Sequence, residues 1–193
     1  MSEIAASVVY RLKMSLRGIS PMIWRRLLVR EEMTLFGLHR AIQIVFGWED
    51  YHLHAFKLHG RHYGTIRTGE RHRNASGREI RLGDLQLRVR QRILYEYDFG
   101  DLWEHEIRVE AILGRDAGKV YPICIGGARA GPPEDIGGPM GYYALLDQPP
   151  ADYYGSVCDE DAGDDGDGLL NYDPERFDRR MVNAELKREL STS

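Results

Sequence analysis

Two histidines, His52 and His54, stand two residues apart in a segment whose alternation predicts a β-strand. Side chains at i and i+2 of a strand point to the same face, about 6–7 Å apart, which suits two ligands of one divalent metal ion. The same spacing is compatible with imidazoles that pack beside the apolar Phe56 and Leu58. The pair therefore identifies a candidate metal site and leaves a core role open.

Five residues of two later segments could complete such a site or act as general acids and bases: Asp98, Asp101, His105, Glu134 and Asp135. The aromatic Phe99 and Trp103 could shield a carboxyl group from water and so raise its pKa into the range of a general acid. Equally, Asp98 and Asp101 flank a tight turn, where Asp commonly bonds its own backbone. His105 falls on the apolar face of its strand, which is typical of a core histidine.

Charge is distributed unevenly along the 193 residues, whose net charge is −4. Residues 1–92 carry 17 Lys and Arg against 8 Asp and Glu, whereas residues 93–193 carry 9 against 22. A basic half can bind the phosphates of nucleic acid, or it can pair with the acidic half of the same chain or of another copy. The candidate phosphate-binding residues are Arg67, Arg71, Arg73, Arg78 and Arg129. Arg129 could instead pair with Glu134 or Asp135.

The elements that must position these residues follow from hydrophobic periodicity. Period-two alternation predicts strands over 8–17, 23–29, 52–58, 92–98 and 102–113. A helix should begin after Thr34, bury Leu35, Leu38, Ile42 and Val45, and end at Gly47. Shorter helices are predicted over 81–87, 139–146 and from Pro174 towards Glu189, with an exposed acidic loop near 152–168. Hairpins with few helices indicate a single α+β domain over 1–193, mainly an antiparallel sheet with packed helices and long Gly/Pro-rich loops.

Several of these segments together resemble the plasmid pRiA4b ORF-3-like family, which is also met as TnpR-like passengers of insertion sequences. The resemblance covers nearly the whole chain and is carried by Pro21–Arg26, Leu38-His39, Gly47–His54, Tyr95–His105, Pro132–Tyr142 and Asp173–Phe177. It implies a mobile-element context and no established activity. Resolvase chemistry is not expected, because it would need a nucleophilic serine in a basic site and the densest cluster of this chain is acidic.

Composition limits the class of protein further. The longest apolar runs are only a few residues, so no membrane span is expected, and two cysteines, Cys124 and Cys158, make no disulfide framework. A cytoplasmic location is expected from these features. The sequence thus favours a non-enzymatic binding module for nucleic acid or a protein partner, with a metal-dependent hydrolase as the alternative and the oligomeric state open.

Overall fold

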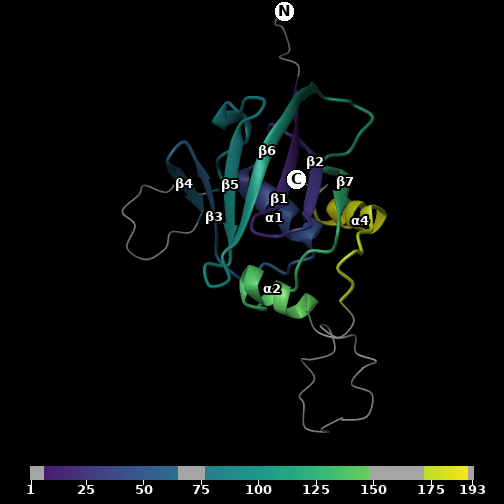
Figure 1. Cartoon of the computed structure of the whole chain (residues 1–193). Helices are drawn as coiled ribbons and strands as arrows, with labels where there is room; N and C mark the ends of the chain where they lie inside the picture. Colours follow the sequence, from purple (N-terminus) through teal and green to yellow (C-terminus); the bar gives the residue numbers. More distant parts are fainter. Residues whose placement is uncertain (1–6, 65–76, 148–171, 191–193) are drawn as a thin grey trace, which may run out of the picture.

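A seven-stranded antiparallel sheet forms the centre of the computed structural model, which describes residues 7–64, 77–147 and 172–190 (Figure 1). Its strands are β1 (Val8–Leu16), β2 (Trp24–Arg30), β3 (His54–Leu58), β4 (Arg61–Gly64), β5 (Arg92–Tyr97), β6 (Trp103–Gly114) and β7 (Ile123–Ala128). They are ordered β4-β3-β5-β6-β1-β2-β7. The predicted α+β class with a mainly antiparallel sheet is confirmed.

The two faces of the sheet differ because the strands alternate apolar and polar residues. In β1, Leu12 and Met14 are completely buried, whereas Arg11 and Lys13 on the other face remain partly exposed. Helix α1 (Leu35–Phe46) covers the apolar face (Figure 1). The core therefore lies between α1 and the sheet, and no helix among the described residues covers the opposite, charged face.

Helix α1 has the boundaries that its sequence predicts. The Thr34 side chain accepts a hydrogen bond from the backbone N–H of Gly37 at 3.0 Å and caps the N-terminus. Gly47, with a φ of 80°, ends the helix, and its N–H donates to the carbonyl of Gln43. Trp48 follows and stacks on Phe46 with ring centroids 5.6 Å apart. The helix end therefore delivers Trp48 and the polar residues after it to one end of the sheet.

Arg25 joins three elements at the centre of the molecule although it is only 2% exposed. Its guanidinium donates hydrogen bonds to the carbonyls of Val45 at 2.6 Å and Ala128 at 2.9 Å. It also lies over the rings of Phe46 and Phe177. Burial lowers the pKa of Arg25 to about 10, so the side chain stays charged at neutral pH and is held by carbonyl dipoles and aromatic faces.

The remaining helices are η1 (Gly83–Leu85), α2 (Gly138–Leu146) and α4 (Arg179–Leu190). The first two agree with the sequence prediction, but the last helix does not begin at Pro174. The Asp178 carboxylate accepts hydrogen bonds from the N–H groups of Arg180 and Met181, so Asp178 is the cap. Among the described residues no helix has the length and apolarity of a membrane span.

Strand β3 also begins later than predicted, at His54 and not at His52. Its pairing with β5 starts at His54, opposite Tyr97. Asp50 has a φ of 64°, and the backbone N–H of His52 donates to the Tyr97 hydroxyl at 3.3 Å instead of joining the ladder. His52 consequently lies in the connection before the strand, and the expected i, i+2 geometry of the two histidines does not form.

Candidate metal centre

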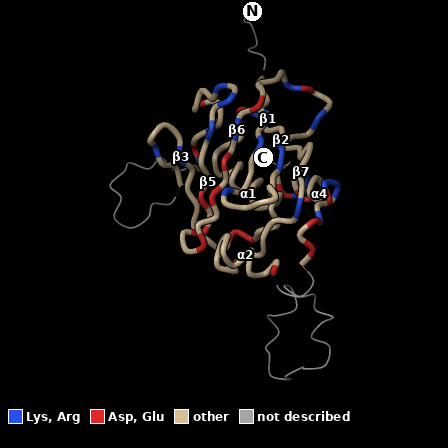
Figure 2. Tube along the Cα trace, in the orientation of Figure 1, with Lys and Arg blue, Asp and Glu red and all other residues tan. Residues whose placement is uncertain are grey.

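Three chain segments meet at the end of the sheet near α2: the connection before β3, the turn between β5 and β6, and the segment that leads into α2 (Figure 1). Acidic residues gather where the β5–β6 turn faces α2 (Figure 2). Folding thus brings together carboxylates that are far apart in the sequence. The question is which of them are already used by the fold and which remain available to a ligand.

Asp98 divides its two oxygens between the fold and the site. Its Oδ1 atom accepts a hydrogen bond from the backbone N–H of Gly100 at 2.8 Å, which is the local turn bond that Asp commonly makes. Its Oδ2 atom lies 3.8 Å from His52 Nε2. The Asp98 side chain is only 12% exposed. One oxygen therefore fixes the carboxylate, and the other is held close to an imidazole.

His52 faces two carboxylates at ion-pair distance without a well-aligned hydrogen bond to either. Its Nε2 atom lies 3.0 Å from Asp135 Oδ1, yet this atom is buried and makes no hydrogen bond of acceptable geometry. One ligand atom from each of His52, Asp98 and Asp135 lies within 4.8 Å of the other two. The Asp135 side chain is 68% exposed, so the cluster opens to solvent on that side. These three side chains, here called the His52 cluster, have the composition of a metal site.

Glu134 and Asp101, also candidates from the sequence, are occupied by the fold. The Glu134 carboxylate accepts a short hydrogen bond from the Tyr97 hydroxyl and a second, at 2.7 Å, from the N–H of Glu49. Asp101 Oδ2 accepts from the N–H of Gly137 at 3.0 Å. Both residues thus anchor the segment that carries Asp135 and position the cluster from outside it.

Close backbone contact fixes the same segment more tightly. Gly138 has a φ of 67°, and a Cβ added there would lie 2.2 Å from the carbonyl oxygen of Asp101. At the other end of the segment, the Trp48 indole N–H donates to the carbonyl of Pro132 at 2.8 Å. The segment can lie this close to the β5–β6 turn only because residue 138 has no side chain.

A second group of possible ligands, His39, Asp50 and His54, is less suited to a shared ion. His39 donates and accepts through both ring nitrogens, with Tyr95 and Asp50 each at 2.8 Å. The rings of His39 and His54 stack 3.5 Å apart at 9°. Because the nitrogen lone pairs lie in the ring planes, parallel rings direct them side by side and not towards one point. Burial lowers the pKa of each imidazole to about 4.

His105 belongs to the core and is separated from the carboxylates. Its ring is completely buried and makes edge contacts with Phe46, Trp48 and Tyr95. Burial lowers the pKa of His105 to about 3, and the nearby backbone of Trp103 and Tyr95 opposes the shift only in part. Neither ring nitrogen makes a hydrogen bond of acceptable geometry within the described structure. A role in proton transfer would require access that this position lacks.

The basic candidates lie elsewhere. Arg129 pairs with Glu175, and not with Glu134 or Asp135, which the sequence offered as one alternative to phosphate. Arg78 lies over the Phe36 ring with 4.2 Å between the guanidinium carbon and the ring centroid. The structure does not describe Arg67, Arg71, Arg73 or the acidic segment 152–168. Sequence reasoning missed Tyr97, His39 and Asp50 as site residues. The only signal for these three residues was that each lies in one of the family-like segments.

Comparison with known proteins extends what the fold shows. Residues 8–181 match the model of the family described as plasmid pRiA4b ORF-3-like protein. The chain is 34% identical over 140 residues to the uncharacterized protein y4hQ of Sinorhizobium fredii (strain NBRC 101917 / NGR234), covering 72% of this chain and 71% of that protein. A crystal structure of the protein of unknown function MM3350 from Methanosarcina mazei Go1 has a TM-score of 0.72 and 38% identity, with 91% of this chain and 97% of that chain covered. The chain therefore belongs to the plasmid pRiA4b ORF-3-like family.

Proposed function

We propose that this protein binds a divalent metal ion through the His52 cluster and that the centre supports metal-assisted hydrolysis. The observation that carries the proposal is the buried His52 Nε2 atom, which lacks a hydrogen bond while facing two carboxylates. A buried polar atom that makes no well-aligned hydrogen bond is costly, and a bound ion would satisfy it. Bonds of about 2.1 Å in a tetrahedral or octahedral site place neighbouring ligand atoms about 3.0–3.4 Å apart. The His52 separations of 3.0 and 3.8 Å are close to this range.

The ligand set indicates the kind of ion and of chemistry. One imidazole and two carboxylates suit Zn²⁺, Mn²⁺ or Fe²⁺ better than the soft ions that prefer sulfur. Three protein ligands leave coordination positions for water or substrate, as in catalytic centres and unlike closed structural sites. A divalent ion held by His52, Asp98 and Asp135 would supply an activated water for attack on an ester or phosphodiester. On the protein side, Asp98 Oδ1 and the Glu134 anchors would hold the ligands in place.

Calorimetric titration of the EDTA-treated protein with Mn²⁺ and Zn²⁺ tests the proposal. We expect one ion per chain and a loss of affinity of more than about tenfold in His52→Ala and Asp98→Asn, since even outer ligand partners commonly contribute that much. His59→Ala is the matched control, because His59 is exposed and bonds only to Gln91 among the described residues. No uptake of either ion, or equal losses in His52→Ala and His59→Ala, would refute the proposal.

His54→Ala separates the two groups of ligands. If His54→Ala abolishes metal binding and His52→Ala does not, the ion belongs to His39, Asp50 and His54 and the proposed assignment is wrong. Hydrolysis is then examined with p-nitrophenyl esters and bis(p-nitrophenyl) phosphate, with and without the bound ion. Binding without turnover of either substrate class would reduce the proposal to a metal-binding protein.

The second candidate is a non-enzymatic binding module for nucleic acid or a protein partner. It draws on the open charged face of the sheet and on the mobile-element setting that the family name suggests. A cytoplasmic location is part of the same proposal. A metal-free protein that still binds such a partner would favour this candidate over the hydrolase.

A further inference from the structure

The open face of the sheet carries a row of cations across four neighbouring strands. Arg92 of β5 lies opposite Arg108 of β6, Arg108 opposite Lys13 of β1, and Lys13 opposite Arg26 of β2. With strands about 4.8 Å apart, this cation row extends over about 14 Å. Like charges directly opposite each other destabilise a sheet. The arrangement therefore costs stability unless negative charge compensates it.

Compensation within the row is incomplete. Arg92 pairs with Glu106 at 3.3 Å, and Lys13 lies over the Trp24 ring. Arg26 pairs with Glu110 through two hydrogen bonds, of 2.6 and 2.9 Å. Arg108 is exposed, and within residues 7–64, 77–147 and 172–190 its side chain has no ion pair or hydrogen bond. The guanidinium of Arg108, without a partner in the part of the chain that the structure describes, thus lies between the cations Arg92 and Lys13.

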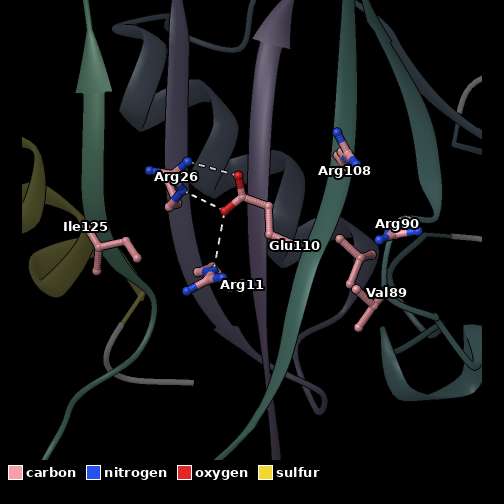
Figure 3. A pocket seen from close by; sticks show the side chains of 8 residues that line it. Arg11, Arg26, Val89, Arg90, Arg108, Glu110 and Ile125 are labelled. Carbon is pink, nitrogen blue, oxygen red and sulfur yellow. Dashed lines mark hydrogen bonds and ion pairs between the residues drawn. The ribbon is translucent and has the colours of Figure 1, made fainter.

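A hollow of 730 Å³ adjoins the row on the face away from α1 (Figure 3). Its charged lining consists of four arginines and one carboxylate: Arg11, Arg26, Arg90, Arg108 and Glu110. The apolar lining is Val89, Val109 and Ile125. The guanidinium groups hold the pKa of Glu110 below its usual range, so it is ionised at neutral pH. This lining, here called the arginine hollow, has a net charge of +3 from the residues just named.

Part of the arginine hollow is fixed and part is free. The two bonds to Glu110 hold Arg26, and Arg11 approaches the same carboxylate at 3.4 Å. Arg90 has its backbone fixed by an N–H···O bond of 2.7 Å to Val109 and a φ of 72°. Its exposed side chain, like that of Arg108, has no bonding partner in the part of the chain that the structure describes. Two donors with fixed backbones are therefore available to a ligand.

We propose that the arginine hollow and the cation row bind the phosphate backbone of a nucleic-acid strand. Guanidinium groups match phosphate geometry and bind it bidentately, and the free Arg90 and Arg108 provide two such contacts. Along one strand of a duplex, a phosphate recurs every ~3.4 Å of the axis. The cation row is therefore long enough to contact several phosphates, and longer than a site for a single phosphate. The site is separate from the His52 cluster and does not depend on metal binding there.

Fluorescence anisotropy with labelled 12-nucleotide single-stranded and duplex DNA, at pH 7.5 in EDTA, tests this inference. We expect binding that weakens steeply between 50 and 200 mM salt. The double variant Arg90→Glu/Arg108→Glu should lose affinity by about tenfold or more. It should also lower the salt slope by about 1–2. Neither side chain bonds within the described structure, so unchanged far-ultraviolet dichroism is expected of the variant.

The control carries the same change of charge, −4, at two exposed positions of α4, as Arg180→Glu/Lys187→Glu. If this control loses as much affinity for DNA as Arg90→Glu/Arg108→Glu does, the attraction is non-specific and the assignment is overturned. Absence of binding by the unaltered protein at 50 mM salt would do the same. Competition by inorganic phosphate or ATP as effective as that of DNA, per phosphate, would show a small-anion site in place of a strand site. Because EDTA is present throughout, these outcomes are independent of the metal proposal.

Discussion

Replacing His105 by Leu should remove one proton from the pH dependence of stability. His105 is completely buried, and burial lowers its pKa to about 3, whereas an exposed imidazole has a pKa of about 6.5. Between these values the unfolded chain binds a proton that the folded chain does not. The free energy of unfolding therefore decreases as the pH falls below about 6.5 and recovers as the pH rises.

The size of this change in the free energy of unfolding follows from the difference between the folded and unfolded pKa values of His105. Each pH unit below 6.5 costs about 1.4 kcal/mol for one such histidine, so at pH 5 the contribution of His105 is about −2 kcal/mol relative to pH 8. His39 and His54, whose pKa values burial lowers to about 4, contribute in the same direction. For the unaltered protein, the free energy of unfolding should thus change with pH with a slope equivalent to nearly three protons in this range. His105→Leu should follow a slope of nearly two.

Urea unfolding monitored by tryptophan fluorescence at half-unit steps from pH 5 to 8, in EDTA, gives the slope directly. His59→Gln is the control, because it also removes one imidazole, but from an exposed position outside the core. If His105→Leu has the same slope as the unaltered protein, His105 is protonated in the folded state. The core would then contain an acceptor that the structure does not show, and the assignment of His105 to the core would be refuted.

Three further perturbations test the packing around the sites. Gly138→Ala should cost about 1–3 kcal/mol and weaken Mn²⁺ binding, because its Cβ would lie 2.2 Å from the Asp101 carbonyl; unchanged urea midpoint and calorimetric affinity would contradict this. Arg25→Met should cost about 2–4 kcal/mol in urea unfolding, since it leaves buried carbonyls without donors, and a neutral result would show that water replaces the guanidinium. In a Cys158→Ser background, Cys124 should react with a thiol reagent only after unfolding, because it is 2% exposed and burial raises its pKa; fast labelling of the folded protein would contradict this.

Much of the fold could be predicted because local patterns and tertiary packing agree. In β6, Trp103, His105 and Ile107 alternate with Glu104 and Glu106, and the structure buries the first set while the second faces outwards. Period-two alternation with one apolar face is a strong signal for such strands. Strand β7 (Ile123–Ala128) was not predicted, because its glycines suggest a loop. Those glycines admit Trp24 and Phe177 against the strand, a tertiary reason that no local pattern reveals.

The candidate site was predicted in composition but not in arrangement. The sequence identified His52, Asp98 and Asp135, and folding brings these three together. It also grouped His52 with His54, because an unbroken strand would place both on one face. The strand begins only at His54, the backbone N–H of His52 bonds to the Tyr97 hydroxyl, and the two histidines belong to different clusters. Whether a carboxylate such as Glu134 binds a ligand or anchors a loop depends on hydrogen-bond partners that are distant in sequence. Spacing alone could therefore not predict it.

The basic and the acidic region lie at opposite ends of β5, so charge is separated along this strand. Arg90 precedes this strand, Arg92 begins it and Asp98 follows it, so the basic hollow and the acidic end are separated by about 20 Å along one strand. Such a separation is a permanent electric dipole, which turns the protein in the field of an approaching polyanion and presents the basic face first. At low ionic strength the same dipole favours head-to-tail contact between copies. At physiological salt, screening over about 8 Å weakens that contact and leaves the face open.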